Sequence, residues 1–353
     1  MIGSARAGRE AGAYRGRPGC DDEPSMERDV LILATGGTIA MRAASSDTTE
    51  GRAGAVPTLD AAALVAEVAE LRDVPGLRAQ TLIGAPGAHL STTDALAIAR
   101  AAVSAADQGA GVVVTHGTDT LEETAFLTDL LYGGAAPIVF TGAIRPASAA
   151  GADGPSNLID AVAVARAPQA DQLGVVVVFG GEVHGARHAC KVDSAGPAAF
   201  ASPAAGPIGR VVEGRLALHA RPLRPARVLA PDSLSGRVAI HSAALGDALP
   251  TLAIDADGAV VVVLGGGHLL PAALVALTDA IARMPVVATV RPARGAFLRT
   301  TYGFHGAEAD LRAAGAIPAG ALSAAAARIK LLACLGAGLG GARLADAFAG
   351  DEA

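Results

Sequence analysis

The chain has 353 residues, enough for two domains of ordinary size, and 51% of its residues are hydrophobic although tryptophan is absent. Its formal net charge is −6 and aromatic residues make up only 3%, which excludes the basic, base-stacking surface typical of nucleic-acid-binding proteins. The longest apolar stretch, residues 259–277, contains three consecutive glycines, a histidine and a proline, a pattern of strand, turn and helix. We therefore expect neither nucleic acid nor a membrane among its partners.

The N-terminal segment and the cysteines indicate where the protein acts. Residues 1–28 lack the apolar core of a secretory signal, and we expect a disordered tail; Met26, just before the first strand, is an alternative start of translation. Cys20, Cys190 and Cys334 lie far apart, without the spacing of a disulfide framework or a zinc site. This cysteine usage fits a cytoplasmic protein.

From residue 30 onward, short apolar runs alternate with longer helical patterns, which is typical of βαβ units and a parallel sheet. Strands are predicted at residues 30–34, 111–115, 137–141 and 174–179. The continuous apolar run in the last of these suits a strand that is covered by helices on both faces. Residues 29–206 are therefore expected to form a large α/β domain.

Helix starts are marked at three places in this domain. Ser91 and Thr120 each precede an acidic residue at capping-box spacing, and Pro155 suits the first turn of a helix. Residues 207–236 lose the periodicity and contain several prolines and arginines, so we expect an interdomain linker there.

A second, smaller unit follows over residues 237–347. Strands are predicted at residues 237–241, 259–264 and 286–290, and helices at residues 271–284 and 323–335. The fold class is thus α/β with two domains, a larger N-terminal parallel-sheet domain and a smaller, flavodoxin-like C-terminal domain.

The first candidate site follows the first strand, where residues 35–40 read Thr-Gly-Gly-Thr-Ile-Ala. The glycines allow a sharp turn that leaves the hydroxyl of Thr38 at the carboxyl edge of the sheet, where open α/β sheets bind ligands. The alternative is that Thr38 only caps a turn. The Gly-x-Gly-x-x-Gly fingerprint of a dinucleotide site is absent from this segment.

A second candidate follows the strand at residues 111–115, where residues 116–120 read His-Gly-Thr-Asp-Thr. Thr118 and Asp119 project from the same edge of the sheet as Thr38, although Asp119 alone is also a suitable helix cap. We expect His116 to be structural. The two motifs together place two hydroxyls and a carboxylate in one region.

Lys191 is the third candidate. The chain has only two lysines, Lys191 and Lys330, among 28 basic residues. A position that keeps lysine against this bias is suited to a group that must lose a proton, which arginine does not do. Lys330 lies in the last predicted helix, and we expect it to extend along the surface to solvent.

Both motifs resemble the signature segments of the bacterial-type L-asparaginase/glutaminase family. Residues 35–40 match the first segment and residues 116–125 the second. Residues 142–146 with 152–158 resemble the next segment, and residues 186–191 resemble the one that ends in the family's catalytic lysine. The resemblance extends from about residue 29 to 346 and is weaker in the second domain.

The resemblance implies a metal- and cofactor-free amidohydrolase that works by acyl transfer. Thr38 is then the nucleophile that attacks the carboxamide of a substrate such as L-asparagine, and Thr118, Asp119 and Lys191 form the relay that accepts its proton. Substrate-binding residues are expected at Gly37, Ala85, Gly117, Thr118, Asp119 and Ala143. Backbone N–H groups near Gly37 and Ala143 are expected to stabilise the oxyanion, and the resemblance also implies a homodimer or homotetramer.

Three departures from the family pattern affect the site. The family often carries a tyrosine in the mobile loop that follows the nucleophile, whereas residues 41–57, the expected mobile loop here, contain none. Ala85 stands where the family usually has a serine for the substrate's α-carboxylate, and Ser91 is the alternative donor. His268, in a Gly-Gly-Gly-His turn, and Glu308 are candidates for contact with a neighbouring subunit's site.

Other functions stay open at this point. One methylene is worth only about 1–3 kcal/mol in a pocket, so a glutaminase or a broader amidase remains an alternative. A non-catalytic amino-acid sensor of the same fold is a second alternative. A phosphate binder is disfavoured, because Asp119 would repel the anion.

Overall fold

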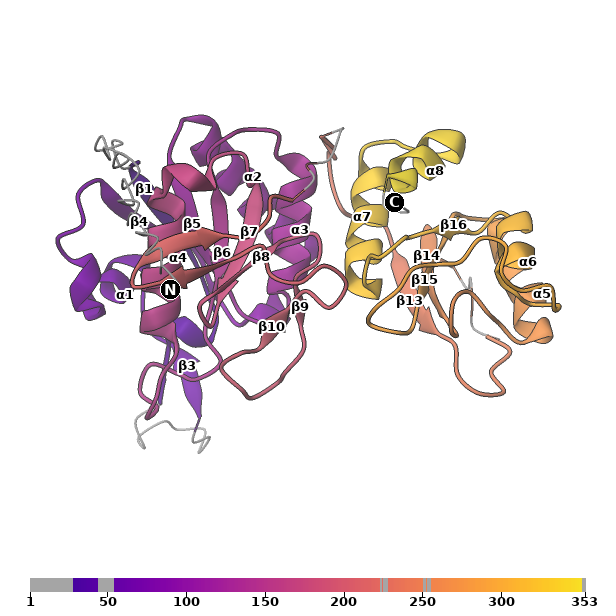
Figure 1. Cartoon of the computed structure of the whole chain (residues 1–353), viewed down its shortest axis with the longest axis horizontal. Helices are drawn as coiled ribbons and strands as arrows, with labels where there is room; N and C mark the ends of the chain where they lie inside the picture. The colour runs from indigo at the N-terminus through magenta and orange to yellow at the C-terminus, as the bar shows by residue number, and fades with distance from the viewer. Residues whose placement is uncertain are drawn as a thin grey trace, which may run out of the picture.

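A computed structural model describes residues 28–43, 54–222, 224, 228–249, 252 and 255–350. The chain forms a larger N-terminal domain and a smaller C-terminal domain that lie side by side, in contact through α3 and α7 (Figure 1). The expected disordered tail, apart from its last residue Arg28, and the alternative start at Met26 lie outside the described residues. Arg28 itself forms an ion pair of 2.6 Å with Asp171.

The N-terminal domain is built on a mixed sheet that, within the described residues, has eight strands in the order β12-β11-β8-β7-β6-β5-β1-β4. Its strands are β1 (Val30–Gly36), β4 (Leu77–Ala85), β5 (Gly111–Thr115), β6 (Ile138–Thr141), β7 (Val175–Phe179), β8 (Glu182–Gly185), β11 (Gly209–Val212) and β12 (Arg215–Leu218). The run β4-β1-β5-β6-β7 is parallel, and β8, β11 and β12 continue it antiparallel. The four predicted strands of this domain are confirmed to within two residues at each end.

Helices cover both faces of this sheet, which is why its central strands are apolar on both sides. The helices are α1 (Ala61–Glu67), α2 (Thr92–Asp107), α3 (Leu121–Leu131) and α4 (Gly154–Arg166). Val112 and Val114 of β5 pack toward α2 and α3, whereas Val113 packs toward α4. Successive residues of a strand point to opposite faces, and here both faces meet a helix layer.

The order of the parallel strands places the site. The chain runs from β1 to β4 on one side, then returns to β5 on the other side of β1. This is the flavodoxin-like order, and the reversal creates a crevice at the carboxyl ends of β1 and β5. Residues 35–40 and 116–120 are the two turns that leave these strands.

The segment expected as a linker at residues 207–236 begins with part of the sheet. β11 and β12 form a hairpin, and β11 pairs with β8. The large sheet therefore extends beyond residue 206 to Leu218, and the connection to the second domain is shorter than expected. These strands were missed because they are only four residues long, mostly exposed or half-buried, and without a continuous apolar run.

The C-terminal domain has a parallel sheet in the order β13-β14-β15-β16 and helices α5 to α8. Its elements are β13 (Val238–Ser242), β14 (Gly258–Val263), α5 (Pro271–Ile281), β15 (Val286–Val290), α6 (Glu308–Ala313), β16 (Ile317–Pro318), α7 (Ala324–Gly336) and α8 (Gly341–Ala349). The strands follow one another in chain order, which differs from the flavodoxin-like order expected for this domain. That order is found in the N-terminal domain.

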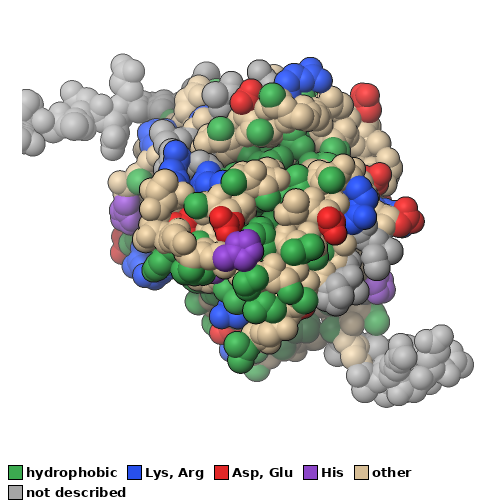
Figure 2. All heavy atoms as spheres, turned by 90° about the vertical axis from the view of Figure 1, so that its right-hand side faces the viewer, with side chains coloured by type: hydrophobic (Ala, Val, Ile, Leu, Met, Phe, Trp, Pro, Cys, Tyr) green, Lys and Arg blue, Asp and Glu red, His purple; other side chains and the backbone are tan. Residues whose placement is uncertain are grey.

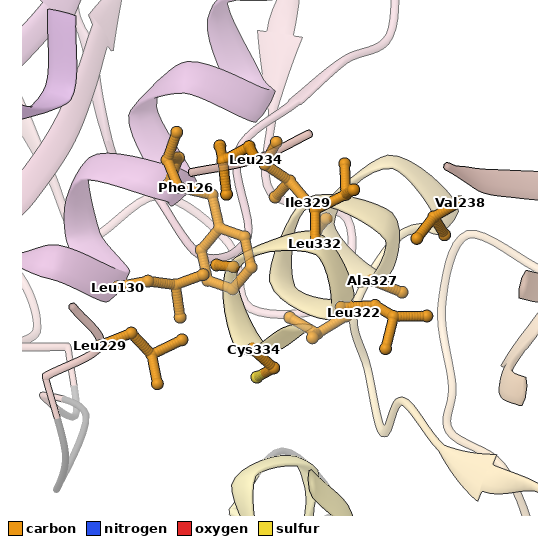
Figure 3. Close-up of a cluster of buried hydrophobic side chains, with 14 of the residues drawn as sticks. Phe126, Leu130, Leu229, Leu234, Val238, Leu322, Ala327, Ile329, Leu332 and Cys334 are labelled. Atoms are coloured by element: carbon orange, nitrogen blue, oxygen red, sulfur yellow. The ribbon is translucent and has the colours of Figure 1, made fainter. Parts of the chain in front are cut away.

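One hydrophobic cluster joins the two domains (Figure 3). Phe126 and Leu130 of α3 pack with Ile329 and Leu332 of α7, and Leu234 of the connection lies beside them. Phe126 is 1% exposed and Leu332 is 1% exposed, so the interface is as dry as a domain core. A buried apolar contact of this kind holds the domains in one arrangement.

Contrary to our expectation, the side chain of Lys330 does not reach solvent. Its side chain is buried in α7, with Nζ 4.9 Å from the ring centre of Phe348 in α8. The expectation was wrong because α8, which was not predicted, folds over this face of α7. Burial, and the nearby charge of Arg187, lower the pKa of Lys330 to about 8. Among the described residues no helix is long and apolar enough to cross a membrane.

Candidate active site

Glycines bring the turns at the carboxyl edge of the sheet into backbone contact. A Cβ on Gly37 would lie 2.4 Å from the Cα of Gly117, and a Cβ on Gly117 would lie 2.5 Å from the nitrogen of Gly87. A Cβ on Gly142 would lie 2.5 Å from the carbonyl oxygen of His116. Side chains at these positions would force the turns apart, so glycine is required here by space.

Thr38 begins the first of these turns. Gly37 has a φ of 78°, a backbone conformation that glycine adopts readily, and Thr38 then opens a short 3₁₀ turn, Thr38–Ala40. Thr38 is half-buried, whereas Ile39 and Ala40 are buried beneath it. The hydroxyl-bearing residue thus lies on the accessible side of a turn whose apolar residues anchor it.

Thr118 and Asp119 follow Gly117 in the turn after β5. The backbones of Gly37 and Gly117 are in contact, so Thr38 and Thr118, which follow them in the chain, start from neighbouring positions. Thr118 is 5% exposed, whereas the side chain of Asp119 is 61% exposed. The structure therefore brings a sheltered hydroxyl and an accessible carboxylate to the turn beside Thr38.

His116 fixes this turn from inside. It is fully buried, and its Nδ1 lies 2.8 Å from the carbonyl oxygen of Gly117. Burial lowers the pKa of His116 to about 4, so the ring is neutral near pH 7 and Nδ1–H is the donor to that carbonyl. His116 thus has the structural role that we predicted.

Lys191 comes from a different part of the chain. It lies in β9 (Cys190–Lys191), which pairs only with β10 (Phe200–Ala201) among the described residues. Its Nζ donates to Oγ1 of Thr118 at 2.9 Å and to Oδ1 of Asp119 at 3.0 Å. The structure thus brings together three of the four residues predicted as catalytic in one hydrogen-bonded group, beside the turn that holds the fourth.

The turn after β6 completes the edge. Asp153 accepts hydrogen bonds from the backbone N–H groups of Ile144, at 2.9 Å, and Arg145, at 2.8 Å. Asn157 donates to the carbonyl of Gly142 at 3.0 Å. These contacts hold the turn that contains the buried Ala143. The turn lies against Thr118, because a Cβ on Gly142 would lie 3.3 Å from the methyl group of Thr118.

Two expected roles of backbone groups are changed by the structure. The N–H of Gly37 donates to the carbonyl of Ala85 at 3.1 Å, so it is not available to an oxyanion. Ala85 ends β4, and its backbone lies directly against Gly36. Ala85 thus supports the first turn through its backbone.

The two capping-box predictions have different outcomes. Ser91 caps α2, with its Oγ accepting from the N–H of Asp94 while Asp94 accepts from the N–H of Ser91, as predicted. The helix start predicted at Thr120 is confirmed, since α3 begins at Leu121, but the Thr120 side chain makes no capping hydrogen bond. Its Oγ1 donates to the carbonyl of Gly87 at 3.0 Å, because the contact between the turns brings that carbonyl within reach.

The comparisons with known proteins agree with this arrangement. Residues 29–224 match the asparaginase N-terminal domain, and residues 237–348 match the glutaminase/asparaginase C-terminal domain. The chain belongs to the asparaginase family.

Named relatives match from about half to most of the chain. A probable L-asparaginase of Deinococcus radiodurans is 36% identical over 329 residues, which cover 89% of this chain and 95% of the relative. A glutaminase-asparaginase of Pseudomonas aeruginosa is 38% identical over 189 residues, 53% of this chain and 51% of the relative. The crystal structure of a probable cytoplasmic L-asparaginase from Campylobacter jejuni has a TM-score of 0.78 at 26% identity, covering 92% of this chain and 99% of that one.

In this asparaginase-family chain, His268 and Glu308 lie together in the C-terminal domain. Nε2 of His268 is 3.6 Å from Oε2 of Glu308, and the backbone N–H groups of Thr301 and Tyr302 donate to Oε1 of Glu308. The His268 ring also packs edge-on against Tyr302 and Phe304, with centroids 4.7 and 5.0 Å apart. Glu308 is fully buried, so only His268 of this pair, which is 21% exposed, is open to a neighbour.

The sequence analysis gave no role to Glu122, which contacts Lys191 directly. Glu122 is in the first turn of α3, and its Oε2 accepts from the backbone N–H of Lys191 at 2.5 Å. The two residues are 69 positions apart, so no local pattern indicates the contact.

The expected mobile loop rises from a hairpin of β2 (Met41–Ala43) and β3 (Ala55–Pro57), and its residues 44–53 lie outside the described part of the chain.

Proposed function

We propose that the chain is an L-asparaginase, which hydrolyses L-asparagine to L-aspartate and ammonia through a covalent acyl-threonine intermediate on Thr38. The observation that carries the proposal is the group formed by Lys191, Thr118 and Asp119 beside the turn that begins with Thr38. A threonine hydroxyl is a weak nucleophile and needs a neighbouring base. The group supplies one at the crevice where this sheet order binds ligands.

The proton path follows from the two hydrogen bonds of Lys191. Oγ1 of Thr38 forms a bond to the carboxamide carbon, and its proton passes to Oγ1 of Thr118. Thr118 in turn passes its own proton to Nζ of Lys191, which is neutral at that stage and 2.9 Å away. The ammonium that results lies 3.0 Å from the carboxylate of Asp119, which stabilises it.

The second half of the reaction reverses the path. The proton returns to the leaving nitrogen, ammonia departs, and the acyl group remains as an ester on Thr38. Water then attacks the ester carbon and the same relay accepts its proton. As the acyl–Oγ1 bond breaks, the relay returns this proton to Oγ1 of Thr38 and L-aspartate is released. Since the N–H of Gly37 is bonded to Ala85, the oxyanion donors are the N–H of Thr38, at the start of its turn, and the turn at Ala143.

Recognition of the substrate's amino group falls to Asp119. Its side chain is 61% exposed and only one of its oxygens is bonded to Lys191, so the other is open to an ammonium group. An ion pair at this point would fix the substrate so that its carboxamide lies over Thr38. We propose that Thr118 and Asp119 bind substrate through their side chains and Gly117 and Ala143 through their backbone. Gly37 and Ala85, whose backbones are hydrogen-bonded to each other, shape the turn that carries Thr38.

Ammonia release decides between this proposal and the alternatives. Wild type and Thr38→Ala are assayed side by side with asparagine and glutamine, and thermal unfolding shows that both are folded. We expect the wild type to release ammonia, with asparagine preferred, and Thr38→Ala to be inactive. A preference for glutamine would make the chain a glutaminase, and ligand-induced stabilisation without any ammonia would favour the sensor.

We also propose a cytoplasmic homodimer or homotetramer. The surface view of the C-terminal domain shows hydrophobic side chains beside charged ones (Figure 2). Tyr302 and Phe304 are 45% and 50% exposed, and they adjoin His268. Exposed aromatic clusters of this kind mark interaction surfaces. The cytoplasmic location is supported by the cysteine usage and by the similar structure's description as cytoplasmic.

A further inference from the structure

We propose that Glu122 is a positioning residue that holds Lys191 against Thr118 and Asp119. This inference rests on the proposed function, because it concerns the lysine of the proposed relay. Glu122 contacts the backbone of Lys191 and is not placed in the relay itself.

Lys191 needs an anchor because its strand is short. β9 has two residues and pairs with the two-residue β10 in a sheet separate from the large one. Two-stranded ribbons of this size have little stability of their own. The hydroxyl and carboxylate that Lys191 meets belong to the turn after β5, so the distance between two independent segments must be kept constant.

Glu122 links these two segments. Its helix, α3, begins directly after the turn that carries Thr118 and Asp119, so Glu122 is fixed relative to both. Its side-chain carboxyl group accepts a hydrogen bond from the backbone N–H of Lys191 at 2.5 Å. One side chain on α3 thus sets the position of the lysine backbone.

The surroundings of Glu122 act on its charge in opposite directions, and the net effect is a raised pKa, with burial as the largest cause. It lies in the first turn of a helix, where the helix dipole stabilises a negative charge. Burial raises the pKa of Glu122, while the hydrogen bond from Lys191 lowers it and the charge of Glu123 raises it. Glu123 itself is paired with Arg328 of α7 at 3.5 Å, which offsets its charge.

Glu123 provides a matched control. It is the next residue of the same helical turn and carries the same carboxylate, but it contacts the C-terminal domain and not Lys191. A general weakening of the start of α3 would affect Glu122→Ala and Glu123→Ala alike. Loss of the Lys191 anchor would affect only the first.

The experiment measures kcat and KM for asparagine, with thermal unfolding, in wild type, Glu122→Ala, Glu122→Gln, Glu122→Asp and Glu123→Ala. We expect Glu122→Ala to lower kcat on the order of 10- to 100-fold with little change in KM, as misplacement by about 1 Å does. Glu122→Gln retains an acceptor of the same length and should stay within about threefold of wild type. Glu122→Asp withdraws the acceptor by one methylene and should also lower kcat. It replaces Glu122→Ala as the test if Glu122→Ala does not fold.

A crystal structure of Glu122→Ala gives a readout besides activity, with the Lys191 Nζ to Thr118 Oγ1 distance expected to exceed the present 2.9 Å. The inference is overturned if Glu122→Ala and Glu122→Asp keep wild-type kcat, if Glu122→Gln is as impaired as Glu122→Ala, or if Glu123→Ala is equally impaired. Lys191→Met separates this from failure of the proposed function. An active Lys191→Met would refute the relay itself, whereas an inactive Lys191→Met with fully active Glu122 variants would refute only the positioning role.

Discussion

Replacing Lys330 by methionine should stabilise the protein near neutral pH. The side chain is 6% exposed, and burial together with Arg187 lowers its pKa from 10.5 to about 8. A pKa difference of this size corresponds to roughly 3 kcal/mol of unfavourable charge burial. The Phe348 ring, 4.9 Å from Nζ, gives back roughly 1–2 kcal/mol through a cation–π contact.

Methionine fills a similar volume and keeps contact with the ring, so we expect Lys330→Met to raise the free energy of unfolding by about 1–2 kcal/mol at pH 7. The pH dependence has a definite sign. Below pH 8 the lysine is protonated in both the folded and unfolded states, so the folded state bears the whole burial cost. Between pH 8 and 10.5 the folded state releases its proton first, and the stability of the wild type rises with pH.

Denaturant unfolding at pH 7 and at pH 10.5 therefore measures the effect twice. The gain in Lys330→Met should be present at pH 7 and largely absent at pH 10.5. Arg343→Met, which removes an exposed positive charge from α8, controls for the change in net charge. The reasoning would be refuted if Lys330→Met were destabilised at pH 7, or if its gain were the same at both pH values.

Two further predictions concern the turns at the site. In Gly117→Ala the new Cβ would lie 2.5 Å from the nitrogen of Gly87, so we expect a loss of about 1–3 kcal/mol in unfolding and a marked loss of ammonia release. Gly84→Ala, which meets no atom within 4 Å, should keep both, and equal behaviour of the two variants would contradict the packing argument. Ser91→Ala should lower stability by about 1 kcal/mol through loss of its cap on Asp94 and leave KM for asparagine unchanged. A large rise in KM would instead make Ser91 a substrate ligand.

The buried strands could be predicted from the sequence because their environment leaves one pattern. All five residues of β5 and of β7 are buried; β7 is a continuous apolar run, and β5 has three consecutive valines. β4 was missed because it is an edge strand whose side chains are largely exposed, so it contains no continuous buried apolar run. Its place beside β1 is a property of the sheet and has no local signal.

The candidate site divides in the same way. Thr38, Thr118 and Asp119 follow recognisable strands, and parallel strands end at one edge, so their proximity could be predicted. Lys191 belongs to a two-residue strand that has no periodicity, and only the family resemblance and the scarcity of lysine pointed to it. The contact of Glu122 depends on how that segment folds back over α3, which no sequence pattern shows.

The central claim, that Thr38 carries the acyl group, is tested most directly by identifying the acylated residue. Wild-type protein turning over asparagine is quenched in acid, digested and mapped by mass spectrometry, with Thr38→Ala as the control. We predict an aspartyl ester on the peptide that contains Thr38 and none in Thr38→Ala. An ester on Thr118, or full ammonia release by Thr38→Ala, would contradict the account.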